Sequence, residues 1–520
     1  MNGADILCDT LLDHGVDVCF ANPGTSEMHF VAALDRKREM RCVLGLFEGV
    51  VTGAADGYAR MADKPAATLL HLGPGLANGL ANLHNARRAR TPVVNVVGDH
   101  ASWHLANDAP LTSDIESLAR PMSHFVRRIE GPGDVAAATA EAWRAAVTLP
   151  GVATLILPGD AAWTDVTEPP ARGRQARIAP LKVASQTIET VAMAARKVLA
   201  RGGRVDVLVS QGGLREVGLA AAGRLGTIAG LRVLAPGSNP RMQRGQGRVT
   251  LPRIPYPIDM GMAMMRDTDL LVLAGATVPV GFFAYPGKSG KLLRDDAEVA
   301  TLATAGDDVA AALADLASAL GAGPGGAVVG PDQKPQGLPS GRLSAEVIGQ
   351  VVGALLPENA IICDEAITAS AAIHAGTVGA PPHDYIQLTG GAIGLGVPMA
   401  VGAAVACPDR KVVAVQADGS AMYTIQGLWT QARESLDVVT IIVSNRAYGI
   451  LQHEMRGVGI NNVGEMAGRM LSLDRPDIDF VGVAKGLGVD GGRAETAEDL
   501  ADLLRRGLAG RGPFLIEAVV

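Results

Sequence analysis

Two oxygen-bearing side chains lie at the ends of apolar runs in the last third of the chain. The run KVVAVQAD ends at Asp418, and the run VVTIIVSN ends at Asn445, 27 residues further on. Such runs are typical of strands in a parallel sheet, whose carboxyl ends meet at the edge where open α/β sheets bind ligands. Carboxylate and amide oxygens suit Mg²⁺ or Ca²⁺, with phosphate oxygens and water completing the coordination. The pattern therefore predicts a metal and phosphate site at that edge.

Gly419 and Ser420 follow Asp418 and are expected to turn the chain into a helix over residues 421–435. The amino end of this helix would offer N–H groups and a positive dipole end to the same phosphates. A simpler alternative is that Asp418 only caps the helix, while Asn445 lies in an unrelated turn. The spacing and the strand that precedes each residue favour the metal site.

Other segments carry residues with chemical potential but weaker patterns. Glu48 ends the apolar run CVLGLFE, where an acid could be a first-turn helix residue or a buried proton carrier. His71 follows the run AATLL, and ANPGTSE (21–27) is a Pro-Gly turn after a strand. The segment GGAIGLGVP (390–398) lacks a clean G-x-G-x-x-G, which weighs against an NAD-dependent oxidoreductase.

The elements that must position these residues alternate between short apolar runs and helical patterns. This alternation predicts an α/β protein with three doubly wound parallel-sheet domains. Two linkers rich in polar residues, Pro or Gly, at 164–180 and 321–342, separate the units. The expected domains are residues 1–165, 180–320 and 342–520.

Composition excludes several classes of function. The net charge is −7, and the absence of a basic stripe argues against a nucleic-acid partner. Five cysteines without a C-x-x-C pair favour reduced thiols in a cytoplasmic protein. The first residues carry Asp5 and no long apolar core, so a signal peptide is not expected, and no window reaches the roughly 18 to 20 apolar residues of a membrane span.

The residues around Asp418, Asn445 and Glu48 resemble the thiamin diphosphate (ThDP)-dependent 2-oxo acid decarboxylase and acetolactate synthase superfamily. The family motif starts with Gly-Asp-Gly and ends about 27 residues later at Asn-Asn or a similar pair; here Ala417 replaces the first Gly, and Ser444 precedes Asn445. This replacement, Ala417 for Gly, affects how tightly the chain can turn and does not change the residues expected to bind the metal. The resemblance implies ThDP and Mg²⁺, with Asp418, Asn445 and the backbone carbonyl of Ala447 as metal ligands.

The resemblance also implies roles for the other segments. Glu48 precedes the helix motif AADGYAR, where the family has the Glu that hydrogen-bonds N1′ of the aminopyrimidine and favours its imino tautomer. His71 matches an active-site His of benzoylformate decarboxylases, so Glu48 and His71 are the expected catalytic residues. The carbonyl of Gly391 would accept from the 4′-amino group, and Ile393 would be the apolar wedge beneath the bent cofactor. The remaining expected cofactor contacts are Pro23, Gly24, Gly419, Ser420 and Tyr448, and the expected substrate contacts are Thr25, His104, Thr368, His453 and Glu454.

One departure from benzoylformate decarboxylases concerns the middle of the chain. Those enzymes have a second catalytic His in the middle domain, whereas VPVGFFAYPGKSG (278–290) has none and carries Phe282, Phe283 and Ala284 there. A decarboxylation relay through two histidines is therefore not expected.

The expected function is ThDP-dependent cleavage and formation of carbon–carbon bonds on a small 2-oxo acid. The main interpretation is acetolactate synthase-like ligation after decarboxylation of pyruvate or a similar acid. The alternatives are a non-ligating decarboxylase of the benzoylformate type and a non-catalytic, ThDP-binding regulatory subunit. FAD is not expected. The family's cofactor lies between two subunits, which implies a homodimer at minimum and a homotetramer as the usual assembly.

Overall fold

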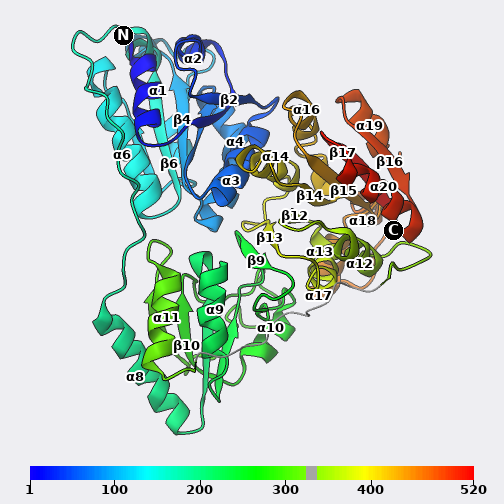
Figure 1. Cartoon of the computed structure of the whole chain (residues 1–520). Coiled ribbons are helices and arrows are strands. Elements are labelled where there is room, and N and C mark those ends of the chain that lie inside the picture. The colour runs from blue at the N-terminus through cyan, green and yellow to red at the C-terminus, as the bar shows by residue number, and fades with distance from the viewer. Residues whose placement is uncertain (324–336) are drawn as a thin grey trace.

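A computed structural model describes residues 1–323 and 337–520, so most of the predicted linker at 321–342 lies outside the described residues. Three sheets follow one another along the chain, each with helices packed against it (Figure 1). The residues between α7 (Gly159–Trp163) and α8 (Ser185–Ala200) form no helix or strand of their own. None of the helices in the described residues combines the length and apolar character needed to cross a membrane.

The N-terminal sheet has six parallel strands in the order β2-β1-β3-β4-β6-β5. Its strands are β1 (Val18–Asn22), β2 (Arg41–Leu44), β3 (Ala66–Leu70), β4 (Val93–Asp99), β5 (Phe125–Arg128) and β6 (Val152–Pro158). One face is covered by α1 (Gly3–Asp13), α2 (Met28–Leu34), α6 (Val135–Thr148) and α7. The other face is covered by α3 (Glu48–Ala62), α4 (Leu72–Ala89) and α5 (Ile115–Ala119). Because both faces are covered, β3, β4 and β6 are buried along their whole length.

The middle sheet has four parallel strands in the order β11-β10-β7-β8. They are β7 (Arg204–Val209), β8 (Leu231–Leu234), β10 (Thr268–Ala274) and β11 (Glu298–Ala303). One face packs against α8, α9 (Glu216–Leu225) and α11 (Val309–Ala319), and the other against α10 (Ile258–Met265).

The C-terminal sheet has seven strands in the order β16-β17-β15-β14-β12-β13-β9. They are β12 (Ile361–Glu365), β13 (His383–Gln387), β14 (Val412–Ala417), β15 (Val438–Ser444), β16 (Asp490–Ala494), β17 (Phe514–Val519) and β9 (Met242–Arg244). One face packs against α12 (Ala345–Leu355), α13 (Ser370–Gly376) and α20 (Ala497–Ala509), and the other against α14 (Gly396–Ala406), α16 (Gly427–Arg433) and α19 (Phe480–Gly486).

One strand departs from the predicted arrangement. β9 comes from the middle of the sequence yet pairs antiparallel with β13 at the edge of the C-terminal sheet. The rest of the architecture confirms the expected α/β fold with three doubly wound parallel sheets. Because β9 is only three residues long and has no apolar run, its own sequence gives no sign of this pairing.

The N-terminal and C-terminal units meet where α3 packs on α14, as Figure 1 shows. Glycines allow the close approach: a Cβ on Gly57 would lie 2.1 Å from the carbonyl oxygen of Met399, and one on Gly402 would lie 1.9 Å from that of Ala54. Since α3 begins at Glu48 and α14 follows the 390–395 segment, this contact fixes two predicted site elements relative to each other.

Candidate active site

Asp418 and Asn445 follow neighbouring parallel strands, as their spacing predicts. Ala417 at the end of β14 is in register with Val443 of β15, so both side chains leave the same edge of the sheet. Asp418 accepts backbone hydrogen bonds from Gly419 (2.7 Å, at Oδ1) and Arg446 (2.7 Å, at Oδ2). Asn445 Oδ1 accepts from the N–H of Ala447 at 3.0 Å. The predicted metal ligands therefore lie in two short loops, after β14 and after β15, which are joined by hydrogen bonds.

Asp418 is only 3% exposed, and burial raises the pKa of its carboxyl above the usual range. Within the described ranges, no Lys, Arg or His nitrogen lies within 4.0 Å of it. An unpaired buried carboxylate is unfavourable unless a cation compensates it. No group of three His, Cys, Asp or Glu side chains able to hold a metal occurs among the described residues. A cation here would thus need Asn445, the Ala447 carbonyl and ligand oxygens as well, which fits a phosphate-bound Mg²⁺.

The turn after Asp418 is tighter than the predicted helix. Residues Asp418–Ala421 form the short helix α15, and the chain becomes helical again only at Gly427, where α16 starts. Ala417 has an ordinary extended backbone (φ −74°, ψ 146°), so the replacement of the family's Gly introduces no strain. Gly419 is required instead, because a Cβ there would lie 2.5 Å from Cε1 of Tyr448.

Tyr448 and Ser420 take different places in this turn. The Tyr448 ring packs over Gly419 at the start of α17 (Gly449–Gly457). The Ser420 hydroxyl is buried and hydrogen-bonds the Gln416 side chain and the carbonyl of Ala417. Through these two contacts the Ser420 side chain stabilises the turn.

The Gly-rich segment at 390–396 is held in an open conformation from two sides. Gly391 and Gly394 have φ of 78° and 96°, a region that favours glycine. From α4, His84 Nε2 lies 3.0 Å from the Gly390 carbonyl, Asn85 donates to the Ala392 carbonyl (2.7 Å), and Asn82 donates to that of Gly394 (3.1 Å). Ile393 lies between these anchors and stays partly exposed.

Glu365 holds the same segment from inside the sheet. It ends β12, is 1% exposed, and accepts from the N–H groups of Gly394 (2.7 Å) and Gly396 and from Gln416 Nε2 (3.0 Å). Burial raises the pKa of Glu365 to about 7, against the lowering effect of these donors. The sequence alone did not single out Glu365 in this role, because its partners come from the distant 394–396 turn.

The carboxyl edge of the N-terminal sheet gathers a second set of predicted residues. Glu48 is the first residue of α3, is 7% exposed, and accepts from Asn78 Nδ2 at 3.0 Å. Gly75 leaves room for it, because a Cβ there would lie 3.3 Å from Glu48 Oε1. No cation pairs with this carboxylate among the described residues, so it is free to act on a ligand group that carries a proton.

His71 directly follows β3 and is paired with an acid that was not predicted from the sequence. Its Nδ1 lies 2.8 Å from Oε2 of Glu27, which also accepts from the N–H of Gly24 (2.8 Å). Glu27 is 1% exposed, and burial raises its pKa. Gly98 leaves space for it, and Gly24 packs directly on the His71 ring. Glu27 ends the ANPGTSE segment, which follows β1, and His71 follows β3. Because β1 and β3 are neighbouring strands, the two residues lie at the same edge of the sheet, and this was the sequence feature that could have paired them.

The remaining predicted residues are not all gathered at these two edges. Thr25 is exposed at the start of a 3-10 turn next to Pro23 and Gly24. Thr368 lies near Asn445, since both approach Gly449. His104 lies in an exposed turn (Ser102–Asn107), where its Nδ1 is 3.1 Å from Asn107.

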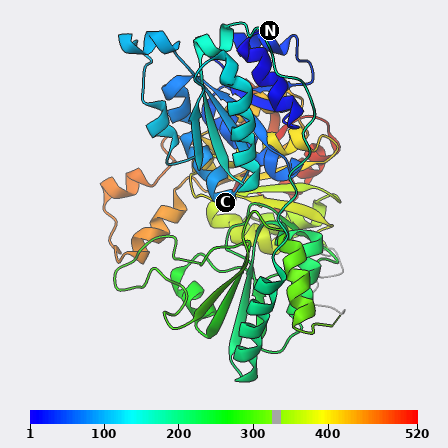
Figure 2. The same cartoon turned by 90° about the vertical axis from the view of Figure 1, so that its left-hand side faces the viewer.

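The two predicted residues of α17 differ in their surroundings. His453 is exposed on the helix surface. Both oxygens of Glu454 accept from tyrosine hydroxyls of the middle unit: Tyr256 at 2.9 Å and Tyr285 at 2.6 Å. Glu454 thus joins α17 to the middle unit. In Figure 2, the orange segment that contains α17 and α18 (Glu465–Met470) stands away from the sheets.

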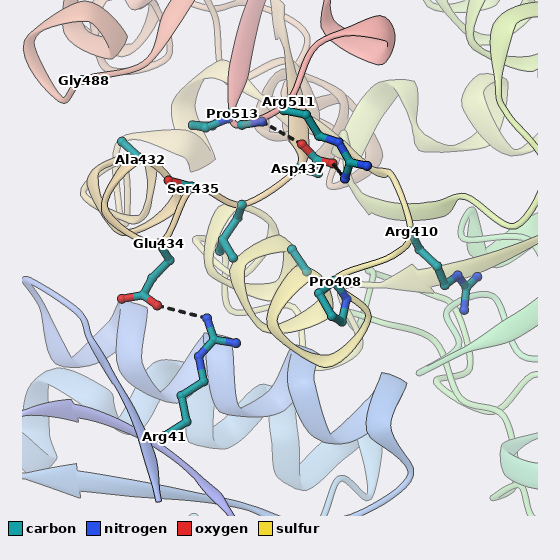
Figure 3. Close-up of a pocket in the computed structure, with 13 residues that line it drawn as sticks. Arg41, Pro408, Arg410, Ala432, Glu434, Ser435, Asp437, Gly488, Arg511 and Pro513 are labelled. Carbon is teal, nitrogen blue, oxygen red and sulfur yellow. Dashed lines mark hydrogen bonds and ion pairs between the residues drawn. The ribbon is translucent and has the colours of Figure 1, made fainter. Parts of the chain in front are cut away.

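A pocket of about 430 Å³ at the opposite edge of the C-terminal sheet carries no comparable chemistry (Figure 3). It is lined by the residues that precede β14, β15 and β17, so it lies at the amino ends of these strands. Its charges are paired: Arg41 with Glu434 at 3.0 Å, and Arg511 with Asp437 at 3.0 Å (Figure 3). The candidate active site is therefore assigned to the carboxyl edges, not to this pocket.

Comparisons with known proteins agree with this assignment. Residues 1–118 match the model of the N-terminal TPP binding domain of thiamine pyrophosphate enzymes, and residues 369–518 match the C-terminal TPP binding domain. Thiamine pyrophosphate is another name for ThDP. A Mycobacterium tuberculosis protein, provisionally named an acetolactate synthase large subunit, is 50% identical over 100% of this chain and 99% of its own length.

More distant relatives cover the whole chain as well. A benzoylformate decarboxylase from Pseudomonas aeruginosa is 29% identical over 98% of this chain and 97% of its own. The solved structure of a ThDP-dependent 4-hydroxybenzoylformate decarboxylase from Rhodococcus jostii superposes with a TM-score of 0.85, covering 100% of this chain and 99% of that one. At 24% identity this last likeness concerns the fold alone. The chain belongs to the thiamine pyrophosphate enzyme family.

Proposed function

We propose that this ThDP-dependent enzyme decarboxylates a small 2-oxo acid and joins the remaining fragment to a second carbonyl compound, in the manner of acetolactate synthases. The observation that carries the proposal is the pair of buried carboxylates, Glu48 and Asp418, at the carboxyl edges of the two sheets that match the family; neither has a cation partner in the described part of the chain. The full-length relative at 50% identity supports ligation over simple decarboxylation. The absence of a His in 278–290 weighs in the same direction.

The residues present fit the cofactor. The backbone of Gly419 and Ser420 would contact the diphosphate, and Mg²⁺ would be held by Asp418, Asn445 and the Ala447 carbonyl. Gly391 and Ile393 would position the aminopyrimidine and thiazolium rings, Tyr448 would cover the diphosphate turn, and Pro23 and Gly24 would wall the pyrimidine pocket. Bound ThDP supplies a thiazolium that accepts the electron pair left when carbon dioxide departs.

The chain's own side chains would manage protons around that cofactor. Glu48 would share a proton with N1′ of the pyrimidine, a role that suits a buried carboxylate whose side-chain partner among the described residues is Asn78. His71 would orient the substrate or move a proton, with Glu27 fixing its ring through Nδ1. Thr25, Thr368, His104 and His453 are kept as candidates for substrate contacts.

We propose a homodimer as the smallest active unit and a homotetramer as the usual one. Large apolar side chains near both carboxyl edges support this, because Leu46, Met422 and Tyr423 are 41 to 53% exposed in the single chain. The proposed domains keep their limits at 1–165, 180–320 and 342–520, for pyrimidine binding, the middle unit and diphosphate binding. All five cysteines are free, which supports a cytoplasmic setting.

The decisive experiment compares Glu48→Gln with wild type on pyruvate and benzoylformate, in the presence of ThDP and Mg²⁺. We expect turnover to fall by a factor of about 100 or more, since general acid–base catalysis contributes about 10²- to 10⁴-fold. Glu358→Gln, an exposed acid at the amino edge of the C-terminal sheet, is the matched control and should behave as wild type. Unchanged turnover in Glu48→Gln would contradict the role of Glu48.

Product analysis by mass spectrometry separates the two reaction types. A 2-hydroxy-2-methyl-3-oxo acid from pyruvate supports ligation, whereas an aldehyde alone supports the decarboxylase alternative. ThDP binding without turnover of any 2-oxo acid would favour a regulatory subunit.

A further inference from the structure

An aromatic side chain from the middle unit lies directly against the segment proposed to hold the aminopyrimidine. A Cβ built on Gly391 would lie 2.5 Å from Cζ of Phe282 and 3.4 Å from both Cε atoms, so the ring tip packs on the Gly391 backbone. Phe282 nevertheless keeps 55% of its surface exposed. One end of the ring is therefore fixed at the site while much of the ring remains available for contact.

The loop that carries Phe282 is anchored from several sides. The Phe282 ring lies 5.5 Å from the ring of Tyr256 and 5.0 Å from that of Phe283. The hydroxyls of Tyr256 and Tyr285 are both used by Glu454 of α17. The nearby polar groups thus bind each other, and Phe282 is the part of the loop that meets the cofactor segment with an apolar surface.

We infer that Phe282 determines substrate specificity, by forming an apolar wall of the substrate pocket that favours 2-oxo acids with an apolar side chain over those with a polar or charged one. The inference rests on the proposed function, because it takes Gly391 as part of the cofactor site. A ring without donors or acceptors gains from contact with a branched or aryl group, and it cannot compensate a polar or charged group for lost hydration. Residues 278–290 contain no His, so this wall offers apolar contact and no side chain that transfers a proton.

The experiment measures kcat/KM for pyruvate, 2-oxobutyrate, 2-oxoisovalerate, benzoylformate and the polar acid 2-oxoglutarate, with ThDP and Mg²⁺ present. Wild type should prefer the acids with an apolar side chain over 2-oxoglutarate. In Phe282→Ala, that preference should fall by about 10-fold or more, the discrimination that a hydrophobic pocket gives per methylene. The change should come mainly from KM, and Phe282→Leu should restore part of it.

Phe283→Ala is the matched control, because Phe283 is the next residue, is similarly exposed at 52%, and has no comparable approach to Gly391. It should keep the wild-type order of substrates. Calorimetric titration with ThDP should give the same affinity for wild type and both Ala variants, so that a change in preference is separated from loss of cofactor.

Two results overturn the inference alone: wild-type turnover with an unchanged order of substrates in Phe282→Ala, or an equal shift in Phe283→Ala. Wild-type protein that binds ThDP and turns over none of the five acids would overturn the proposed function and this inference with it.

Discussion

Replacing Gly402 by Ala tests whether the contact between α3 and α14 organises the site. The two helices approach so closely that an added Cβ at position 402 would lie 1.9 Å from the Ala54 carbonyl oxygen and 2.4 Å from the Tyr58 backbone nitrogen. Both obstacles are helical backbone, which cannot rotate away as a flexible side chain could. The helices would have to separate by more than 1 Å to restore about 3.4 Å, the shorter limit of ordinary carbon contacts.

The expected loss of stability depends on the packing between α3 and α14 that this separation would disturb. The core between these helices is close-packed, with Ala54, Met399 and Ala403 almost fully buried, and forced overpacking of such a core costs about 1 to 3 kcal/mol or more. The helix propensity gained by Gly→Ala, up to about 1 kcal/mol, offsets part of this. We expect a net loss of about 2 kcal/mol, which lowers Tm by roughly 4 to 8 °C for a unit of 150 to 250 residues.

Differential scanning calorimetry of the protein without added ThDP is the direct assay. Gly486→Ala is the matched control, because Gly486 ends helix α19 and a Cβ added there would have no other atom within 4 Å. Its Tm should stay within about 2 °C of wild type. Equal Tm values for Gly402→Ala and Gly486→Ala would refute the view that this helix contact is rigid. ThDP affinity should fall in Gly402→Ala as well, because α14 directly follows the 390–395 segment that is proposed to contact the cofactor.

Three further predictions concern the acids of the site. Asp418→Ala should weaken Mg²⁺-dependent ThDP binding by about 100-fold, as measured by calorimetric titration, since even groups behind a metal ligand are worth about 10- to 100-fold; unchanged affinity would remove Asp418 from the metal site. Glu27→Gln should lower kcat by about 10-fold and shift the acidic limb of the pH–rate profile while ThDP affinity is kept, because the support of His71 at Nδ1 is weakened; an unchanged profile would limit Glu27 to a structural role. Glu365 has a folded pKa raised to about 7 from an ordinary value near 4.5, so its protonation contributes stability that is fully present below pH 4.5 and lost as the pH rises through 7, roughly 3 kcal/mol in all. In Glu365→Gln the fall in Tm between pH 5 and pH 8 should therefore become smaller, and an equal fall in both proteins would refute the shifted pKa.

The sequence correctly predicted the location of those residues that directly follow a single predicted strand. Asp418, Asn445 and Glu48 all follow apolar runs, and the geometry of a parallel sheet brings the carboxyl ends of such runs to one edge. The pairing of β9 with β13 could not be foreseen, because it depends on where the middle unit docks and not on the three residues of β9.

The sequence did not predict the roles of Glu27 and Glu365, for a different reason. Glu27 and Glu365 act on residues that are 44 and 29 to 31 positions away along the chain, through turns rather than along a strand. The predicted helix over 421–435 was wrong in its first half for a local reason: α15 ends at Ala421, and helical structure resumes only at Gly427. Glu365 is a single acid at the end of a strand, and nothing in the sequence around it indicates that it hydrogen-bonds the turn at 394–396.

The two buried carboxylates that lack a cation partner among the described residues, Glu48 and Asp418, indicate that a bound ligand would stabilise the site. Glu48 and Asp418 are each the first residue of a helix and each almost fully buried, yet no side-chain cation of the described residues pairs with either. The helix amino ends compensate a negative charge only in part. A metal ion at Asp418 and a protonated ring nitrogen at Glu48 would supply the missing compensation, so two positions that are locally unfavourable for stability become favourable when the cofactor binds. With the cofactor between two subunits, as proposed, each of the two carboxylates would be compensated by a bound cofactor, so ThDP and Mg²⁺ should raise the stability of the fold.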